Sequence, residues 1–208
     1  MIKIWKSINL YQLNSSDIKL AEKVMAKAYF EAEEEFQFKK ASKNLKFLEK
    51  LMHTTLKYTI RQGRVFAPSP QLEGVAAWLP SDKIFISDWQ YIRSGILIPI
   101  IIAGRKWLKK MRVYDELCKK KHQEHADFPH LYLYNLAVHP EQQKKGYASI
   151  LLNPVLAVLD QIGLACYLET NERNIPLYKH FGFQVVDQVF LNEFDSKAYF
   201  MLRKGKRD

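Results

Sequence analysis

Residues 143–149 combine small side chains with two cations in a way that suits the binding of a phosphate group. The segment reads Gln143-Lys144-Lys145-Gly146-Tyr147-Ala148-Ser149, between an apolar run that stops at Pro140 and an apolar stretch with helical spacing. Small residues at the start of a helix let backbone N–H groups approach a ligand, and the positive end of the helix dipole attracts an anion. The segment therefore predicts a strand, a phosphate-binding loop and a helix, with a pyrophosphate as the ligand.

Two common nucleotide loops do not fit this spacing. The segment has no Gly-Lys-Ser/Thr end, and it lacks the first glycine of a dinucleotide fingerprint. Gln143, Gly146 and Ala148 instead follow the pattern Gln or Arg, two residues, Gly, one residue, Gly or Ala. The segment thus resembles the acyl-CoA loop of the GNAT superfamily of N-acetyltransferases. This resemblance implies an α/β (α+β) fold with a mixed, mostly antiparallel central sheet flanked by helices.

The resemblance continues on both sides of the loop. Leu136-Ala-Val-His-Pro140 resembles the fourth strand of that superfamily, whose backbone pairs with the pantetheine arm, and the segment 174–183 resembles its last motif, a short helix that ends in Gly-Phe. The superfamily's fifth strand diverges from the fourth beyond a bulge and admits that arm. By resemblance, the acetyl-CoA contacts are Leu136, Ala137, Val138, Gln143, Lys144, Lys145, Gly146, Tyr147, Ala148, Ser149 and Asn174.

Acetyl transfer to an amine needs a polarised thioester carbonyl, a neutral nucleophile and a proton for the leaving thiolate. A backbone N–H near Leu136 to Val138 would hold the developing oxyanion. Tyr178 matches the superfamily's usual general acid, although a buried tyrosine is also an ordinary core residue. Many members carry a glutamate on the fourth strand, where this chain has Tyr134 and Asn135. The base is therefore open: a water chain held by these two residues, Glu169 or His130.

The other elements follow from hydrophobic spacing and turn signals. Helices are expected over 18–29 and 45–60, the second ending at Gly63, and strands over 65–68 and 75–80 as a hairpin. A further strand over 164–170, a helix from Asn174 to Gly182 and an antiparallel pair over 183–202 complete the sheet. A glutamate cluster (Glu31, Glu33, Glu34 and Glu35) between the first two helices is either a solvated turn or an attraction for a cationic amine.

Residues 81–127 are expected to form a helical insertion between the third and fourth strands. The first half is strongly apolar but is interrupted by Gly95, Pro99 and Gly104, so it is too short to span a membrane. The second half predicts an amphipathic helix with Trp107 on its apolar face. Core packing is the default for such a helix; shaping the acceptor side, a homodimer contact and contact with an anionic membrane surface are the alternatives.

Composition limits the class of protein. The 208 residues, 48% hydrophobic, can bury a substantial core and are expected to form one domain over 1–208, with the acetyl-CoA-binding core at 131–191. The formal net charge is +10, but the cations are dispersed, which argues against a nucleic-acid-binding module. Cys118 and Cys166 predict free thiols, and no secretory signal is recognisable, so a cytoplasmic protein is expected. Cys118 and the histidines 122, 125 and 130 do not match a metal-site spacing, so no metal is predicted.

These observations predict an acetyl-CoA-dependent N-acetyltransferase that acts on a primary amine of a small molecule or protein by direct attack in a ternary complex. The alternative is a non-catalytic acyl-CoA-binding sensor, which the missing fourth-strand glutamate makes reasonable. Catalytic turnover separates the two.

Overall fold

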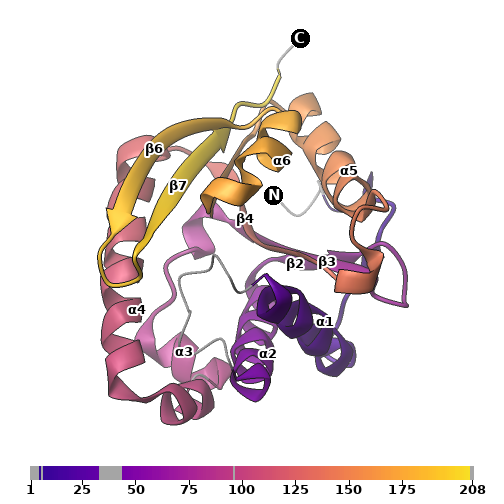
Figure 1. The fold of residues 1–208 in the computed structure, drawn as a ribbon. Helices are drawn as coiled ribbons and strands as arrows, with labels where there is room; N and C mark the ends of the chain where they lie inside the picture. The colour runs from indigo at the N-terminus through magenta and orange to yellow at the C-terminus, as the bar shows by residue number, and fades with distance from the viewer. Residues whose placement is uncertain (1–4, 6, 33–43, 96, 207–208) are drawn as a thin grey trace.

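A seven-stranded mixed sheet forms the centre of the fold, in the order β1-β2-β3-β4-β5-β7-β6 (Figure 1). The computed structural model describes residues 5, 7–32, 44–95 and 97–206. The strands are β1 (Tyr11–Gln12), β2 (Arg64–Ala67), β3 (Gly74–Pro80), β4 (His130–Val138), β5 (Ala165–Thr170), β6 (Gln184–Leu191) and β7 (Ser196–Arg203). Of the neighbouring pairs, β4 and β5 are parallel and the others are antiparallel. The predicted fold class is confirmed.

Helices cover both faces of the sheet. They are α1 (Ile18–Glu31), α2 (Leu45–Gln62), α3 (Asp88–Ser94), α4 (Leu97–His125), α5 (Tyr147–Gln161) and α6 (Ile175–His180). Figure 1 shows α5 and α6 on one side of the sheet and α1 and α2 on the other. The apolar faces of α5 and α6 share one core with Leu131, Leu133 and Leu168, whereas α1 and α2 share another with Val75 and Ala137. Successive side chains of a strand point to opposite faces of the sheet, and here they are apolar on both faces, so each face has its own core.

The hairpin β2–β3 and the pairing of β3 with β4 fix the strand that leads to the loop. Arg64 pairs with Trp78, and Gly74 pairs with Val138. A Cβ atom at Gly74 would lie 2.9 Å from the carbonyl oxygen of Ala137, so only glycine lets the two backbones approach this closely. The end of β4, and with it the start of the loop, is thereby held against β3.

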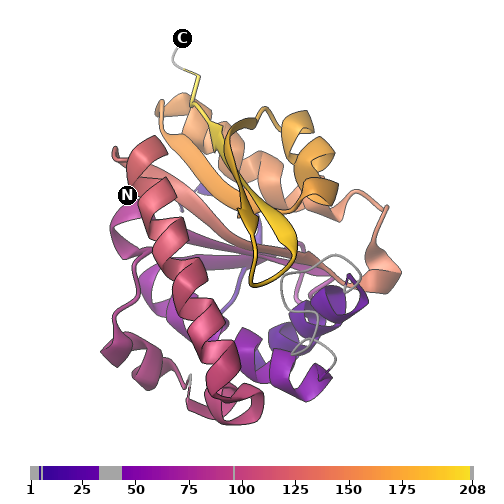
Figure 2. The ribbon, with the colours of Figure 1, turned by 60° about the vertical axis from the view of Figure 1, so that its left-hand side comes forward.

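The helical insertion lies between β3 and β4, as predicted, but its helix is longer than the sequence indicated. α4 begins at Leu97, because Pro99 falls in the first turn, where the missing N–H breaks no helical bond. Gly104 interrupts the helix with φ 82° and ψ 173°. Figure 2 shows α4 running along the side of the molecule after this kink. None of the helices in the described residues combines the length and the apolar composition of a membrane span.

The residues that directly precede α1 and α6 do not cap these helices with their side chains. Asn174 directly precedes α6 but forms no side-chain cap; Asn171 instead accepts a hydrogen bond from the Asn174 amide at 3.2 Å, because a short 3-10 turn precedes the helix. Asp17 likewise leaves α1 uncapped and accepts hydrogen bonds from the Asn14 amide and the Tyr11 hydroxyl. Of the glutamate cluster, Glu31 ends α1, and residues 33–35 lie outside the described part of the chain.

Candidate functional site

The loop between β4 and α5 exposes a helix N-terminus beside two cations. Lys144 (φ 63°) and Gly146 (φ 84°) both adopt the left-handed conformation, and Gly146 immediately precedes α5. No side chain caps that helix, and the first α-helical bond joins the Ile150 amide to the Gly146 carbonyl at 3.1 Å. The amides of the first turn therefore remain available to a ligand. Residues 143–146 are exposed, and a Cβ at Gly146 would meet no atom within 4 Å.

Next to the loop, β4 and β5 separate. They pair from His130 opposite Ala165 to Tyr132 opposite Tyr167, and both strands continue beyond this point. The register of β4 against β3 also shifts there: Ala77 pairs with Asn135 and Trp78 with Leu133, so Tyr134 is the extra residue of a β-bulge. A bulge bends and twists its strand, which explains why β4 leaves β5 at this point. We call this open end the β4–β5 splay.

The splay leaves one edge of β4 facing outward. The His139 amide donates to the Glu73 carbonyl on the β3 side at 2.9 Å, and backbone groups alternate in direction along a strand. The amides of Leu136 and Val138 therefore point to the opposite edge, toward the splay. The side chain of Gln143 reaches the same edge, since its amide nitrogen lies 3.3 Å from the Val138 carbonyl oxygen. An extended ligand could thus pair with this edge and end at the loop.

Tyr178 approaches the splay from the α6 side. Its side chain is only 7% exposed and packs edge-to-face on Phe183 at 5.8 Å between ring centroids. Burial raises the pKa of its phenol, and the phenol of Tyr29 and the thiol of Cys166 are near enough to raise that pKa further. The phenol therefore stays protonated near neutral pH, the state required of a hydrogen-bond or proton donor.

Glu169 approaches from the opposite face, two residues beyond the last β4–β5 pair. The hydroxyl of Tyr132 donates a hydrogen bond to its carboxylate. Burial raises the pKa of Glu169 to about 7, Tyr132 opposes this shift and the negative charge of Asp115 on α4 adds to it. A carboxylate with such a pKa accepts a proton near neutral pH and later releases it, which suits a general base.

Tyr134 and Asn135, the residues predicted to hold a water chain, lie side by side at the bulge. Leu133 and Leu136 both belong to the core under α5, so the two residues between them, Tyr134 and Asn135, project to the side of α1 and α4. Asn135 donates a hydrogen bond to the Tyr29 hydroxyl at 2.9 Å, and its own side-chain oxygen is buried without a partner in the described structure. Such an oxygen is a suitable acceptor for an ordered water or a ligand amine.

His130, the remaining candidate base, lies at the closed end of the strand pair. It is fully buried, and its Nδ1 donates to the Phe128 carbonyl at 2.8 Å. Burial lowers the pKa of its imidazole. Six residues of extended strand, roughly 20 Å, separate it from Leu136. This position does not favour a role for His130 in proton transfer at the splay.

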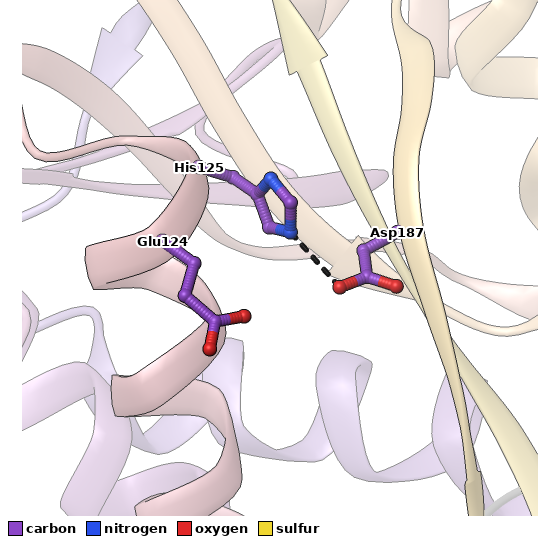
Figure 3. Close-up of side chains that lie close together, drawn as sticks. All are labelled: Glu124, His125 and Asp187. Carbon is purple, nitrogen blue, oxygen red and sulfur yellow. Dashed lines mark hydrogen bonds and ion pairs between the residues drawn. The ribbon is translucent and has the colours of Figure 1, made fainter.

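The histidines and Cys118 do not gather into one ligand set. Within the described residues, the group with the spacing of metal ligands is Glu124, His125 and Asp187 (Figure 3). His125 contributes an Nε2 that lies 2.9 Å from Asp187, and the ammonium of Lys121 lies 2.7 Å from Glu124 and 2.8 Å from Asp187. A protein cation already bridges both carboxylates. We interpret the group as a link between α4 and β6.

Two further residues, Tyr29 and Tyr132, contact the candidate site residues Asn135 and Glu169 and were not predicted from the sequence. Tyr29 reaches Asn135 across more than a hundred residues, and nothing local in α1 indicates that contact. Tyr132 could have been recognised, because the period of two places it on the same face as Tyr134, next to the strand that carries Glu169. The sequence could not show how far apart β4 and β5 are at this point.

Comparison with known proteins relates part of the chain to acetyltransferases. Residues 112–183 match the family model described as the acetyltransferase (GNAT) family. An uncharacterized N-acetyltransferase of Schizosaccharomyces pombe is 37% identical over 68 residues, which are 32% of this chain and 28% of that relative. The chain thus matches little more than a quarter of that relative's length.

Solved structures share the fold over nearly the whole chain. A Corynebacterium glutamicum protein described as "histone acetyltransferase HPA2 and related acetyltransferase" has a TM-score of 0.65 at 19% identity, covering 97% of this chain and 98% of that one. Arylalkylamine N-acetyltransferase 2 of Aedes aegypti has a TM-score of 0.60 at 14% identity, covering 95% and 98%. At these identities the likeness concerns the fold alone.

Proposed function

We propose that this chain is a member of the GNAT family of acetyltransferases and that it transfers an acetyl group from acetyl-CoA to a primary amine by direct attack in a ternary complex. The observation that carries the proposal is the coincidence of the β4–β5 splay with an exposed helix N-terminus at the end of the same strand. The splay offers backbone donors to an extended arm, and the loop offers them to a pyrophosphate. Acetyl-CoA has both an extended pantetheine arm and a pyrophosphate, and the family match supports it as the ligand.

In this proposal the loop holds the diphosphate of acetyl-CoA. The amides of residues 145–149 would face the phosphate oxygens, and Lys144 and Lys145 would supply opposite charge. Lys145 also contacts the side-chain oxygen of Gln142 at 3.1 Å. The pantetheine arm would then run along the free edge of β4, pairing with Leu136 and Val138, and would pass Asn174 at the start of α6.

The reacting carbonyl would lie where β4 and β5 separate. A β4 amide polarises the thioester carbonyl, and the amine nitrogen attacks its carbon. As the C–N bond forms and the C–S bond breaks, the amine proton passes to Glu169, directly or through a water held by Tyr134 and Asn135. Tyr178 donates a hydrogen bond or its proton to the departing thiolate. The products are the acetylated amine and CoA.

Two structural neighbours support an amine acceptor without deciding its size. One solved structure is named as an arylalkylamine N-acetyltransferase and another as a ribosomal-protein-S18-alanine N-acetyltransferase from Escherichia coli. We therefore propose a small-molecule or protein primary amine. Cys118 and Cys166 are free thiols, which accords with a reducing compartment and with the proposed cytoplasmic location.

Release of the CoA thiol in the presence of an amine panel tests the reaction, and the pH dependence tests the base. We expect kcat/KM to rise with pH and to level off above an apparent pKa of about 7, the value for Glu169. Glu169→Gln should lower the plateau ~100-fold and remove this ionisation. Unchanged turnover in Glu169→Gln would exclude the carboxylate as the base. Acetyl-CoA binding without turnover on any amine would instead support the non-catalytic sensor.

A further inference from the structure

The helical insertion exposes large apolar side chains at one end of the molecule. Trp89 is 69% exposed and Ile92 is 46% exposed on α3, while Leu97 is 52% and Ile101 is 80% exposed in the first turns of α4. Their spacing places Trp89 and Ile92 on one face of α3, and Leu97 and Ile101 on one face of α4. Both views show α3 and the start of α4 at the end of the molecule that is far from α5 and α6 (Figures 1 and 2).

The exposure of these side chains does not result from a detached insertion, because the inner side of the insertion packs against the rest of the molecule. On the inner side of the insertion, Ser94 is 2% exposed, and Trp107 packs edge-to-face on Phe47 of α2 at 5.2 Å between ring centroids. Gly104 lies between that anchored part of α4 and the apolar first turns, and its non-helical backbone sets them at an angle. The fold therefore presents this apolar surface on a fixed support. Clustered exposure of large apolar residues marks an interaction site.

Cations border the apolar side chains. Between residues 84 and 113 the chain has six Lys or Arg residues and a single acidic residue, Asp88. Arg93, Arg105, Lys106 and Lys109 are exposed, and within the described chain none of them forms an ion pair. Arg93 shares its helix face with Trp89, and Arg105 directly follows the kink at Gly104. An occupant of this surface must accept apolar side chains and supply negative charge around them.

We propose that α3 and the start of α4 dock on an anionic phospholipid surface, with Trp89, Ile92, Leu97 and Ile101 in the acyl–headgroup boundary. A bilayer offers both requirements at once: an apolar interior and a negatively charged headgroup layer. A second copy of this chain fits less well, because its own surface is equally basic and the net charge of each copy is +10. Nucleic acid would satisfy the cations but would leave the isoleucines in water.

The tryptophans provide a direct measurement of docking. Trp5 and Trp107 are 9% exposed and Trp78 is fully buried, so a solvent change at an exposed tryptophan reports on Trp89. On addition of vesicles of phosphatidylcholine and phosphatidylglycerol, we expect the emission to shift to shorter wavelength and the protein to float with the vesicles. Vesicles of phosphatidylcholine alone should bind far less, and added salt should weaken binding. Trp89→Phe should remove the shift while the protein still floats.

Variants separate the contribution of the cations to vesicle binding from that of the apolar side chains. Lys106→Glu with Lys109→Glu should weaken binding to anionic vesicles ~20-fold or more, since each cation near such a surface contributes about fivefold. Ile101→Ser should weaken it as well. Ile162→Ser is the matched control: Ile162 is 45% exposed and directly follows α5, which lies at the other end of the molecule, and its loss should leave binding unchanged. Circular dichroism and a Tm equal to that of the parent show that each variant is folded.

Three results would overturn the proposal: no binding to anionic vesicles, equal binding of the Ile101→Ser and parent proteins, or binding that does not distinguish anionic from neutral vesicles. A dimer that Ile101→Ser converts to a monomer, without vesicle binding, would assign the surface to a second copy instead. These outcomes are independent of acetyl transfer, which is measured with water-soluble substrates.

Discussion

At the scale of single residues, Tyr178 offers the cleanest separation of chemistry from binding. Tyr178→Phe keeps the ring that packs on Phe183 and removes only the phenolic hydroxyl. We expect kcat to fall ~100-fold, the usual contribution of a positioned acid, with acetyl-CoA affinity within about twofold of the parent. Steady-state kinetics and calorimetric titration provide the two numbers.

A second phenol serves as the control for that experiment. The Tyr167 hydroxyl is buried without a hydrogen-bond partner in the described structure, and Tyr167 pairs with Tyr132 at the closed end of the splay. Tyr167→Phe should therefore leave turnover unchanged. Equal losses in both variants would show that Tyr178 acts through packing and has no role as a donor.

Gly146 tests the charge at the loop. Asn and Asp have nearly the same shape, and both tolerate the left-handed conformation that Gly146 adopts at φ 84° better than other side chains do. We expect Gly146→Asp to bind acetyl-CoA ~tenfold more weakly than Gly146→Asn, because the added carboxylate repels the diphosphate. The dissociation constants of the two folded variants decide the matter. Similar constants would mean that the diphosphate lies elsewhere.

At the scale of secondary-structure elements, α4 is joined to the sheet through a buried histidine. His122 is 4% exposed, stacks on Tyr167 at 5.0 Å between centroids and lies 4.6 Å from the ring of His130, with Phe85 and Tyr132 beside it. Burial lowers the pKa of His122 to about 4, and the charge of a protonated His130 lowers it further. Both imidazoles are therefore neutral at pH 7.

The sign of the resulting pH effect follows from linkage. The folded state binds the His122 proton more weakly than the unfolded chain, whose value is 6.5, so this contribution to stability is complete above pH 6.5 and is lost as the pH falls toward 4. We expect the parent to lose roughly 2 kcal/mol more than His122→Phe over that interval. Urea unfolding at several pH values measures the difference. Parallel pH profiles of the two proteins would show that His122 does not titrate in unfolding.

The elements also show where sequence reasoning succeeds and where it stops. The loop, the hairpin and the end of α2 at Gly63 depend on local spacing and turn residues, and they were predicted from these signals. The bulge at Tyr134 depends on how β4 meets β3, and the contact of Asn135 with Tyr29 depends on how α1 packs. Such long-range contacts leave no periodic signal. Pro99 was predicted to interrupt the helix, but it lies in the first turn of α4, where a proline is tolerated. The sequence alone did not show that the helix begins at Leu97.

At the scale of the whole molecule, the net charge of the chain and the β4–β5 splay would both contribute to the proposed binding of acetyl-CoA. A net charge of +10 raises the local concentration of any polyanion, so charge alone would favour acetyl-CoA and ATP alike. The splay, in contrast, offers its backbone donors to an extended arm, which acetyl-CoA has and ATP lacks. The two contributions therefore differ in their dependence on salt and on the part of the ligand beyond the diphosphate.

Thermal unfolding separates them in one experiment. A ligand that binds the native state at ~100 times its dissociation constant adds about 2.7 kcal/mol of stability, which for a chain of this size raises Tm by roughly 5–10 °C. We expect this rise with acetyl-CoA at moderate salt, and a much smaller one with ATP at the same concentration that vanishes as salt is added. If acetyl-CoA and ATP raise Tm equally and salt abolishes both effects, the basic surface alone accounts for binding, and the splay holds no pantetheine arm.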